Sequence, residues 1–336
     1  MRQLSLLFLA VVILVVCGAQ PQASWTVEYD TQHYHVQARI PREKADELGN
    51  FMELVFKVYT ALMNIKEAPA NKFPLQIYAD RNDYVNVGKA PPGSGAYYLP
   101  SEKRLVGYYD PKSMYSFFAH EGMHQFVDVA QPNFNDVAFK ATWYSEGIAD
   151  CIGNCEVINK KLYMCRKNGY IASIRLPVIQ KAIAMNKHVP LAQFFALNKQ
   201  QYYANPALCY SQGWSLCHFF MTYPKVEESS KQIPNGKYRL FLAYFHELLL
   251  SGENLAGATA AAMLKGNDDG PKPTKKELDA SGITAASATK LKSLDGGKMP
   301  SIGDLEKEWK EYIVNFNKPP PEKEKKPSEA KPAQGK

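Results

Sequence analysis

The sequence predicts an α+β protein, in which an N-terminal α/β lobe with a small mixed sheet is followed by a mainly helical lobe. Three observations predict this fold class. Segments rich in β-branched and aromatic residues occur in the first third of the chain. Apolar residues at helical spacing dominate after that third. An apolar content of 46% with 22% charged residues is typical of a globular protein with a substantial core.

The first lobe is predicted from alternating strand-like and helical patterns. Residues 25–40 are rich in β-formers with partial alternation, which indicates one or two strands that end at Pro41. Residues 44–63 carry apolar side chains at helical spacing, which indicates an amphipathic helix. Further strands are predicted at residues 73–78, 96–99 and 105–109.

After these strands, a helix is predicted to start at Asp110, where a capping carboxylate precedes a proline, and to run to about residue 129. Residues 264–300 mix Gly, Asp, Lys, Ser and Pro, which predicts a surface insertion. Further helices are predicted from about residue 142 and at residues 177–185, 191–197, 207–221, 238–250 and 302–316.

The N-terminus has the pattern of a targeting segment. Arg2 precedes an apolar run at residues 4–16, and small residues then allow cleavage after Ala19. We therefore expect residues 1–19 to be a signal peptide and the protein to be exported, either periplasmic or secreted. Val16 is larger than the residue that usually precedes a lipidated cysteine, which argues against a lipid anchor at Cys17. No later segment is apolar for long enough to span a bilayer.

Charge gives no sign of a nucleic-acid partner. The net charge is +7, but the Pro/Lys/Glu-rich tail at residues 318–336 contributes six Lys and three Glu, and Arg2 adds one more positive charge. The remaining +3 forms no basic stripe interleaved with aromatic residues. The tail is almost free of apolar residues, so we expect it to be disordered. One globular domain is predicted at residues 20–317.

Five cysteines follow the predicted cleavage site, and their odd number leaves at least one thiol without an intramolecular partner. A bridge between Cys155 and Cys165 is conceivable in an exported protein. Cys151 and Cys155 are four residues apart, as on one helical face, and are not expected to pair. None of the cysteines has the C-x-x-C spacing of a structural zinc site.

The pattern H-E-x-x-H at His120, Glu121 and His124 indicates metal chemistry. Residues four apart lie on one face of a helix, so both imidazoles can bind the same ion. Zinc accepts imidazole nitrogen and needs a third protein ligand. Glu121 stays near the metal and can accept a proton from water. An acidic residue, Glu146, follows His124 by 22 positions, within the sequence W-Y-S-E-G-I-A-D.

These two motifs together resemble those of the gluzincins, zinc metallopeptidases whose third ligand is a glutamate on a second helix. Thermolysin-like and leukotriene A4 hydrolase-like enzymes belong to this group. The chain is also similar to an uncharacterised family of predicted exported bacterial peptidases. The resemblance implies that Glu146 is the third ligand and that Asp150 orients a ligand histidine. We expect a zinc site in the cleft between the two lobes.

Two further stretches bear on the reaction. Tyr210, in Y-S-Q-G, is similar to an aminopeptidase tyrosine that hydrogen-bonds the developing oxyanion, although Gln212 departs from that motif and a packing role is nearly as well supported. His218 is more consistent with a packed core histidine. Residues 95–98 lack the acid that holds a substrate amine in the aminopeptidases, which favours an endopeptidase and leaves other exopeptidases open. That segment can also pair with an extended peptide.

The sequence thus predicts a zinc metallopeptidase that hydrolyses peptides or proteins with water, with Glu121 as base and Tyr210 as oxyanion donor. Two alternatives stay open. One is a catalytically silent zinc-binding module of the cell envelope. The other is a zinc hydrolase that acts on something other than peptides.

Overall fold

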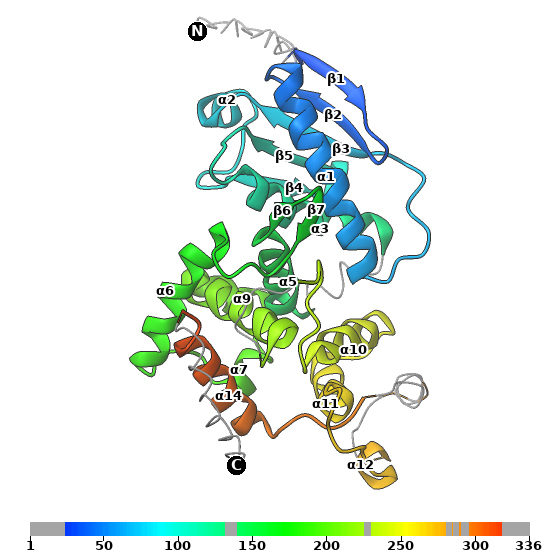
Figure 1. Cartoon of the computed structure of the whole chain (residues 1–336), viewed down its shortest axis with the longest axis vertical. Helices are drawn as coiled ribbons and strands as arrows, with labels where there is room; N and C mark the ends of the chain where they lie inside the picture. The colour runs from blue at the N-terminus through cyan, green and yellow to red at the C-terminus, as the bar shows by residue number, and fades with distance from the viewer. Residues whose placement is uncertain are drawn as a thin grey trace, which may run out of the picture.

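The computed structural model describes residues 24–131, 140–224, 230–279, 284, 289 and 296–317. It confirms the predicted α+β class, with a five-stranded mixed sheet in the N-terminal lobe and a mainly helical lobe after it (Figure 1). The predicted signal peptide at residues 1–19 and the tail at residues 318–336 lie outside the described residues.

The sheet has the strand order β1-β2-β3-β5-β4. Its three central strands β2, β3 and β5 run parallel, and the strands at both edges are antiparallel to their neighbours. The register pairs Leu75 with Leu105, and Leu105 in turn with Tyr98 of the edge strand β4. The strands are β1 (Val27–Asp30), β2 (Tyr34–Ala38), β3 (Phe73–Tyr78), β4 (Ala96–Leu99) and β5 (Arg104–Tyr108).

The two faces of this sheet are covered differently. Helices α1 (Arg42–Leu62) and α3 (Met114–Ala130) pack against one face, where the Tyr59 hydroxyl of α1 donates to the Ala119 carbonyl of α3 at 2.6 Å. The short helix α2 (Arg81–Asn86) covers part of the other face with Tyr84. The edge strand β4 has β5 as its one strand partner among the described residues.

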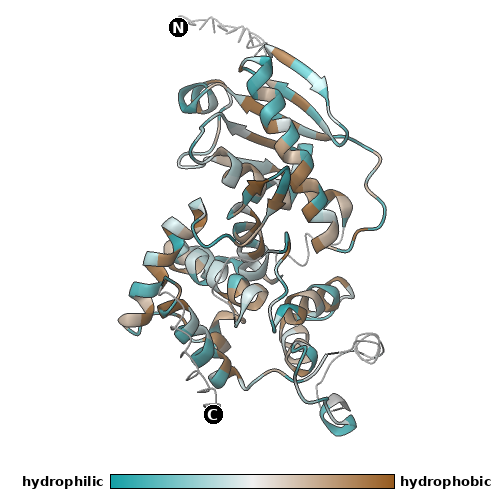
Figure 2. Ribbon diagram, in the orientation of Figure 1, coloured by the Kyte–Doolittle hydropathy of each residue, from teal (hydrophilic) through white to brown (hydrophobic). Residues whose placement is uncertain are grey.

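The helical lobe is built around α5, in which every residue from Thr142 to Gly153 is buried. Helix α5 lies between α3 of the first lobe and α9 of the second (Figure 1). Buried apolar residues of all three helices belong to one hydrophobic core. Figure 2 colours the ribbon by the hydropathy of each residue. The remaining elements are β6 (Glu156–Ile158), β7 (Lys161–Tyr163), α6 (Tyr170–Ala184), α7 (Leu191–Phe194), α8 (Lys199–Ala204), α9 (Pro206–Thr222), α10 (Arg239–Leu250), α11 (Leu255–Lys265), α12 (Lys275–Asp279) and α14 (Ile302–Val314).

Several element boundaries differ from the sequence prediction. Helix α3 begins at Met114 rather than at Asp110, because the Asp110 carboxylate accepts from the Lys112 backbone within a turn. Helix α6 begins seven residues before Pro177, which lies inside it. Proline removes the hydrogen bond to the carbonyl four residues earlier, and this carbonyl belongs to the exposed Ser173, where water can replace the bond.

The predicted insertion at residues 264–300 begins and ends at adjacent points. Asn267 and Gly297 exchange backbone hydrogen bonds of 3.1 and 2.8 Å, so the chain leaves and returns at one place. Helix α11, just before it, was not predicted. Its alanine-rich sequence favours a helix, and the Asn254 side chain caps its start by accepting from the Gly257 backbone at 2.8 Å.

The five described cysteines, Cys151, Cys155, Cys165, Cys209 and Cys217, are free thiols, so no Cys155–Cys165 bridge is present. In the part of the chain that the structure describes, no helix combines the length and the apolar character needed to cross a bilayer.

His218 is a core residue, which makes the stability of the fold sensitive to acid. Its imidazole contacts the Tyr312 hydroxyl at 2.8 Å and the Cys165 carbonyl at 3.1 Å. Burial lowers its pKa to about 4. The folded protein therefore keeps His218 neutral between pH 6.5 and 4, where the unfolded chain takes up a proton.

We expect this histidine to cost about 3 kcal/mol of unfolding free energy as the pH falls from 6.5 to 4. Urea unfolding at pH 7, 5 and 4 measures the loss. The His218→Gln variant, compared over the same range, should lose correspondingly less because it has no proton to take up at this position. Equal pH dependence in the two proteins would show that His218 does not cause the loss.

Candidate metal centre

Two helices from different lobes supply the candidate ligands. His120 and His124 lie one turn apart on α3, which packs on the sheet, and Glu146 and Asp150 lie one turn apart on α5. A small residue brings the helices close together. A Cβ atom at Gly153 would lie 2.7 Å from the Ser116 carbonyl oxygen of α3, so this position of α5 has no room for a side chain.

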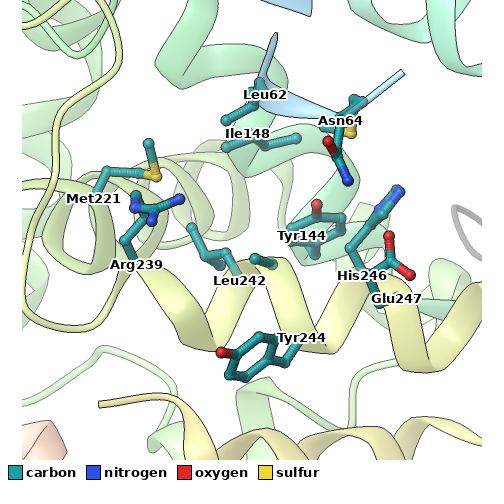
Figure 3. A pocket seen from close by; sticks show the side chains of 12 residues that line it. Leu62, Asn64, Tyr144, Ile148, Met221, Arg239, Leu242, Tyr244, His246 and Glu247 are labelled. Atoms are coloured by element: carbon teal, nitrogen blue, oxygen red, sulfur yellow. The ribbon is translucent and has the colours of Figure 1, made fainter. Parts of the chain in front are cut away.

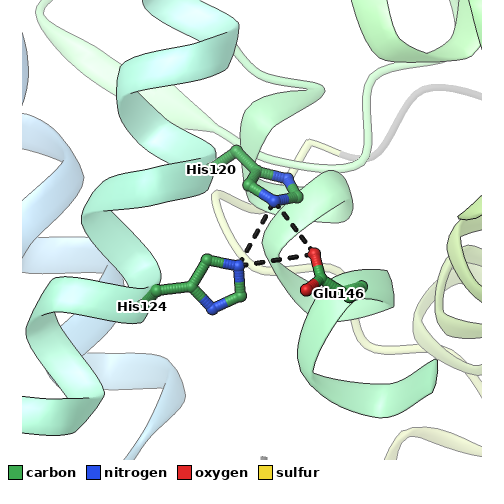
Figure 4. A group of neighbouring side chains, drawn as sticks. All are labelled: His120, His124 and Glu146. Carbon is green, nitrogen blue, oxygen red and sulfur yellow. Dashed lines mark hydrogen bonds and ion pairs between the residues drawn. The ribbon is translucent and has the colours of Figure 1, made fainter. Parts of the chain in front are cut away.

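Three potential ligand atoms converge between these helices (Figure 4). Nε2 of His120 lies 3.3 Å from Nε2 of His124 and 3.2 Å from Oε2 of Glu146, and the third side of the triangle measures 3.5 Å. Bonds of about 2.0–2.1 Å in tetrahedral geometry place neighbouring ligands roughly 3.3 Å apart. The spacing of the donor atoms therefore fits a single tetrahedral cation.

The hydrogen bonding of the triad also fits a cation. Nδ1 of His120 lies 2.9 Å from Oδ1 of Asp150, which is 1% exposed, so a neutral His120 donates its proton there and turns a lone pair toward Glu146. Oε2 of Glu146 is buried without a hydrogen bond. Lone pairs of His120 and Glu146 thus point into the same small space, where a cation can accept them. The His120–His124–Glu146 group could hold a metal.

The close approach of these groups shifts the pKa values of His120 and Glu146. Burial alone would lower the pKa of His120, but the neighbouring carboxylates of Asp150 and Glu146 outweigh it and hold the pKa well above its usual value. Burial alone would raise the pKa of the Glu146 carboxyl, but the two imidazoles hold it well below its usual range. Glu146 is therefore a carboxylate, the form that binds a cation.

Glu121 lies between the triad and the sheet. Its Oε2 accepts a hydrogen bond of 3.1 Å from the backbone N–H of Tyr98 in the edge strand β4. Burial raises the pKa of its carboxyl, against the opposing effects of His120 and His124. A carboxyl whose proton affinity is raised beside a cation site has the properties of a general base.

Two tyrosines lie on the α8–α9 side of the triad. The hydroxyl of Tyr203, in α8, donates to Oε1 of Glu146 at 2.8 Å, although the residue is 40% exposed. Tyr210, in α9, lies beside Tyr203 with 6.2 Å between the ring centres, and burial and the nearby Glu146 raise the pKa of Tyr210. The predicted Tyr210 therefore reaches the site together with a second tyrosine.

Arg175 of α6 connects the carboxylate behind His120 to these tyrosines. Its Nε donates to Oδ2 of Asp150 at 2.9 Å, and its guanidinium lies 4.7 Å from the centre of the Tyr210 ring. Asp150 is thus fixed from both sides, by His120 and by Arg175, which restrains the orientation of the imidazole.

The structure brings together the six predicted site residues, His120, Glu121, His124, Glu146, Asp150 and Tyr210. Sequence reasoning missed Tyr203 and Arg175. Neither lies in a recognisable motif, and α8 and the first half of α6 were not predicted, so no spacing argument could have assigned them. The adjacent tyrosines 202 and 203, shortly before the Tyr210 motif, were the one available signal.

No protein-family model matches the chain, and no curated protein matches its sequence. The likeness to gluzincins consequently rests on the motif residues.

Proposed function

We propose that this chain is an exported zinc-dependent peptidase of the gluzincin type, with His120, His124 and Glu146 as ligands. The convergence of two imidazole nitrogens and one carboxylate oxygen at 3.2–3.5 Å supports the proposal most directly. Two nitrogen ligands and one oxygen ligand are a set that zinc accepts in hydrolases. When bound, zinc acts as a Lewis acid and lowers the pKa of water to about 7.

The residues of the chain then divide the remaining work. Glu121 accepts a proton from the attacking water and passes it to the leaving amine. Asp150 holds the proton on Nδ1 of His120, which keeps Nε2 available as a ligand. Tyr210 and Tyr203 offer hydroxyl groups beside Glu146, from where one of them can donate to the oxyanion of the tetrahedral intermediate.

The edge strand β4 favours a peptide as the substrate. Its N–H at Tyr98 points away from β5 and toward Glu121, so the outer edge of the strand borders the proposed base. Extended peptides bind exposed sheet edges through backbone hydrogen bonds. A peptide added along β4 would pass beside Glu121.

Metal analysis of the purified protein together with a peptide-library digest tests the proposal. We expect one equivalent of zinc per chain and cleavage that a chelator abolishes and added zinc restores. Stoichiometric zinc without cleavage of any peptide would favour the silent zinc-binding module, and cleavage without a metal would refute the proposed mechanism.

Kinetic measurements should distinguish the roles of Tyr210 and Tyr203. If Tyr210 donates to the oxyanion, Tyr210→Phe should lower kcat by about 10²–10³-fold with the zinc affinity unchanged. Tyr203→Phe removes the donor to Glu146 Oε1, so we expect it to weaken zinc binding. Steady-state kinetics and a competitive zinc titration of both variants measure these effects. A kcat loss in Tyr203→Phe alone would transfer the oxyanion role to Tyr203.

A further inference from the structure

A cavity of about 350 Å³ lies among the C-terminal end of α1, helix α5, the end of α9 and helix α10 (Figure 3). Tyr144 and Ile148 of α5 line it. Each is two residues from Glu146, which corresponds to about 200° around a helix of 3.6 residues per turn. The cavity and the candidate metal centre therefore occupy opposite sides of the same helix.

The middle of the cavity is apolar. Leu62, Ile148 and Leu242 project into it from three different helices (Figure 3). Small-molecule sites commonly measure about 300–1,000 Å³ and combine apolar walls with a few polar groups. The size and the walls suit a small ligand with an apolar body.

A buried hydroxyl faces this space. Tyr144 is 2% exposed, and its ring packs against Phe245 and His246. Figure 3 shows its oxygen among the side chains that line the cavity. Among the residues that the structure describes, none forms a hydrogen bond with this hydroxyl. A hydroxyl of a buried residue that has no hydrogen-bond partner among the described residues points to a polar ligand atom or water.

Opposite charges mark the two ends. Arg239 and Glu247 both line the cavity and lie eight residues apart on one face of α10, with the small Ala243 between them. Eight residues of helix span about 12 Å. The Arg239 Nε donates to the Asn235 side chain at 2.9 Å, and no described carboxylate forms an ion pair with its guanidinium.

We propose that this cavity binds a short apolar peptide with free termini, about three residues long. Arg239 binds its carboxylate, Glu247 its ammonium group, and the Tyr144 hydroxyl one of its backbone carbonyls. Three extended residues span roughly 10–11 Å, close to the roughly 12 Å that separate Arg239 and Glu247 along the axis of α10. A fatty acid fits less well, because its apolar end would lie against the Glu247 carboxylate and desolvate it.

This inference does not depend on hydrolysis at the metal centre, although such a peptide is the size of product that a peptidase releases. The tests use the full chain carrying Glu121→Gln, so that the probe is not cleaved. Isothermal titration calorimetry then measures binding of Ala-Leu-Ala, its C-terminal amide, its N-acetyl form and decanoate.

We expect Ala-Leu-Ala to bind at least tenfold more tightly than the amide, the acetylated peptide or decanoate. Arg239→Gln should weaken binding of Ala-Leu-Ala at least tenfold and leave binding of the amide unchanged. Glu247→Gln should also weaken binding of Ala-Leu-Ala at least tenfold, and should leave binding of the acetylated peptide unchanged. Arg42→Gln, at an exposed arginine of α1, is the matched control and should bind as the parent does.

Equal affinity for the free peptide and its amide, or unchanged binding by Arg239→Gln, would overturn the proposal. Tighter binding of decanoate than of the peptide would do so as well, in favour of a fatty-acid site. Zinc content and cleavage are measured separately on the chain with Glu121 intact, so failure of either proposal leaves the other standing.

Discussion

Glu121→Gln should abolish peptide hydrolysis while leaving zinc bound. The substitution keeps the size of the side chain and its hydrogen bond from the Tyr98 backbone, and removes the group that accepts the proton. General bases of this kind contribute about 10²–10⁴-fold to the rate, so kcat should fall by at least that factor. Zinc content by mass spectrometry and kcat on a cleaved library peptide are the two measurements.

His124→Ala gives the complementary result. It removes one of the three ligands, so zinc content and hydrolysis should fall together. The pair of variants separates loss of the base from loss of the metal. Hydrolysis at the wild-type rate by Glu121→Gln would rule out Glu121 as the base, and loss of zinc in that variant would make it a residue that supports metal binding instead.

Gly147→Ala should destabilise the protein, although alanine is the better helix former. A Cβ atom there would lie 2.6 Å from the Gly213 carbonyl oxygen and 2.7 Å from Sγ of Cys217, both in α9. Backbone atoms cannot move aside cheaply, so α5 and α9 must separate. Overpacking of this kind costs about 1–3 kcal/mol, more than the roughly 1 kcal/mol that alanine gains in helix propensity.

Gly303→Ala is the control for this prediction. Gly303 lies in the first turn of α14, and its nearest neighbour to a new Cβ atom would be the Ser301 side chain at 3.9 Å. Its free energy of unfolding in urea should stay the same or rise by up to about 1 kcal/mol. If Gly147→Ala is as stable as Gly303→Ala, the contact of α5 with α9 is looser than these distances indicate.

The sequence predicted the parts of the fold that follow a strong local pattern. The strands at residues 73–78 and 96–99 and the amphipathic helix at residues 44–63 are examples, because periodic burial appears directly in the residue types. The hairpin of β6 and β7 was missed, since its strands have three residues each and are largely exposed. Helix α6 was predicted too short because an exposed position tolerates Pro177.

The candidate site divides in the same way. His120, Glu121 and His124 share one helical turn and a fixed spacing, so the sequence alone places them near one another. Glu146 and Asp150 were assigned by resemblance. The contacts of Tyr203 with Glu146 and of Arg175 with Asp150 join residues 57 and 25 positions apart. Such contacts depend on how α6, α8 and α5 pack, which no local pattern specifies.

The placement of the three candidate ligands has a mechanical consequence. Two of them belong to α3, which packs on the sheet, and the third belongs to α5, which packs on α9. A cation bound by all three would therefore link the two lobes. The free energy of cation binding and the free energy of separating the two lobes would then be thermodynamically linked. If the triad binds a metal, a change that loosens the packing of α5 should weaken the metal affinity without touching a ligand, and removal of the metal should loosen the contact between α3 and α5.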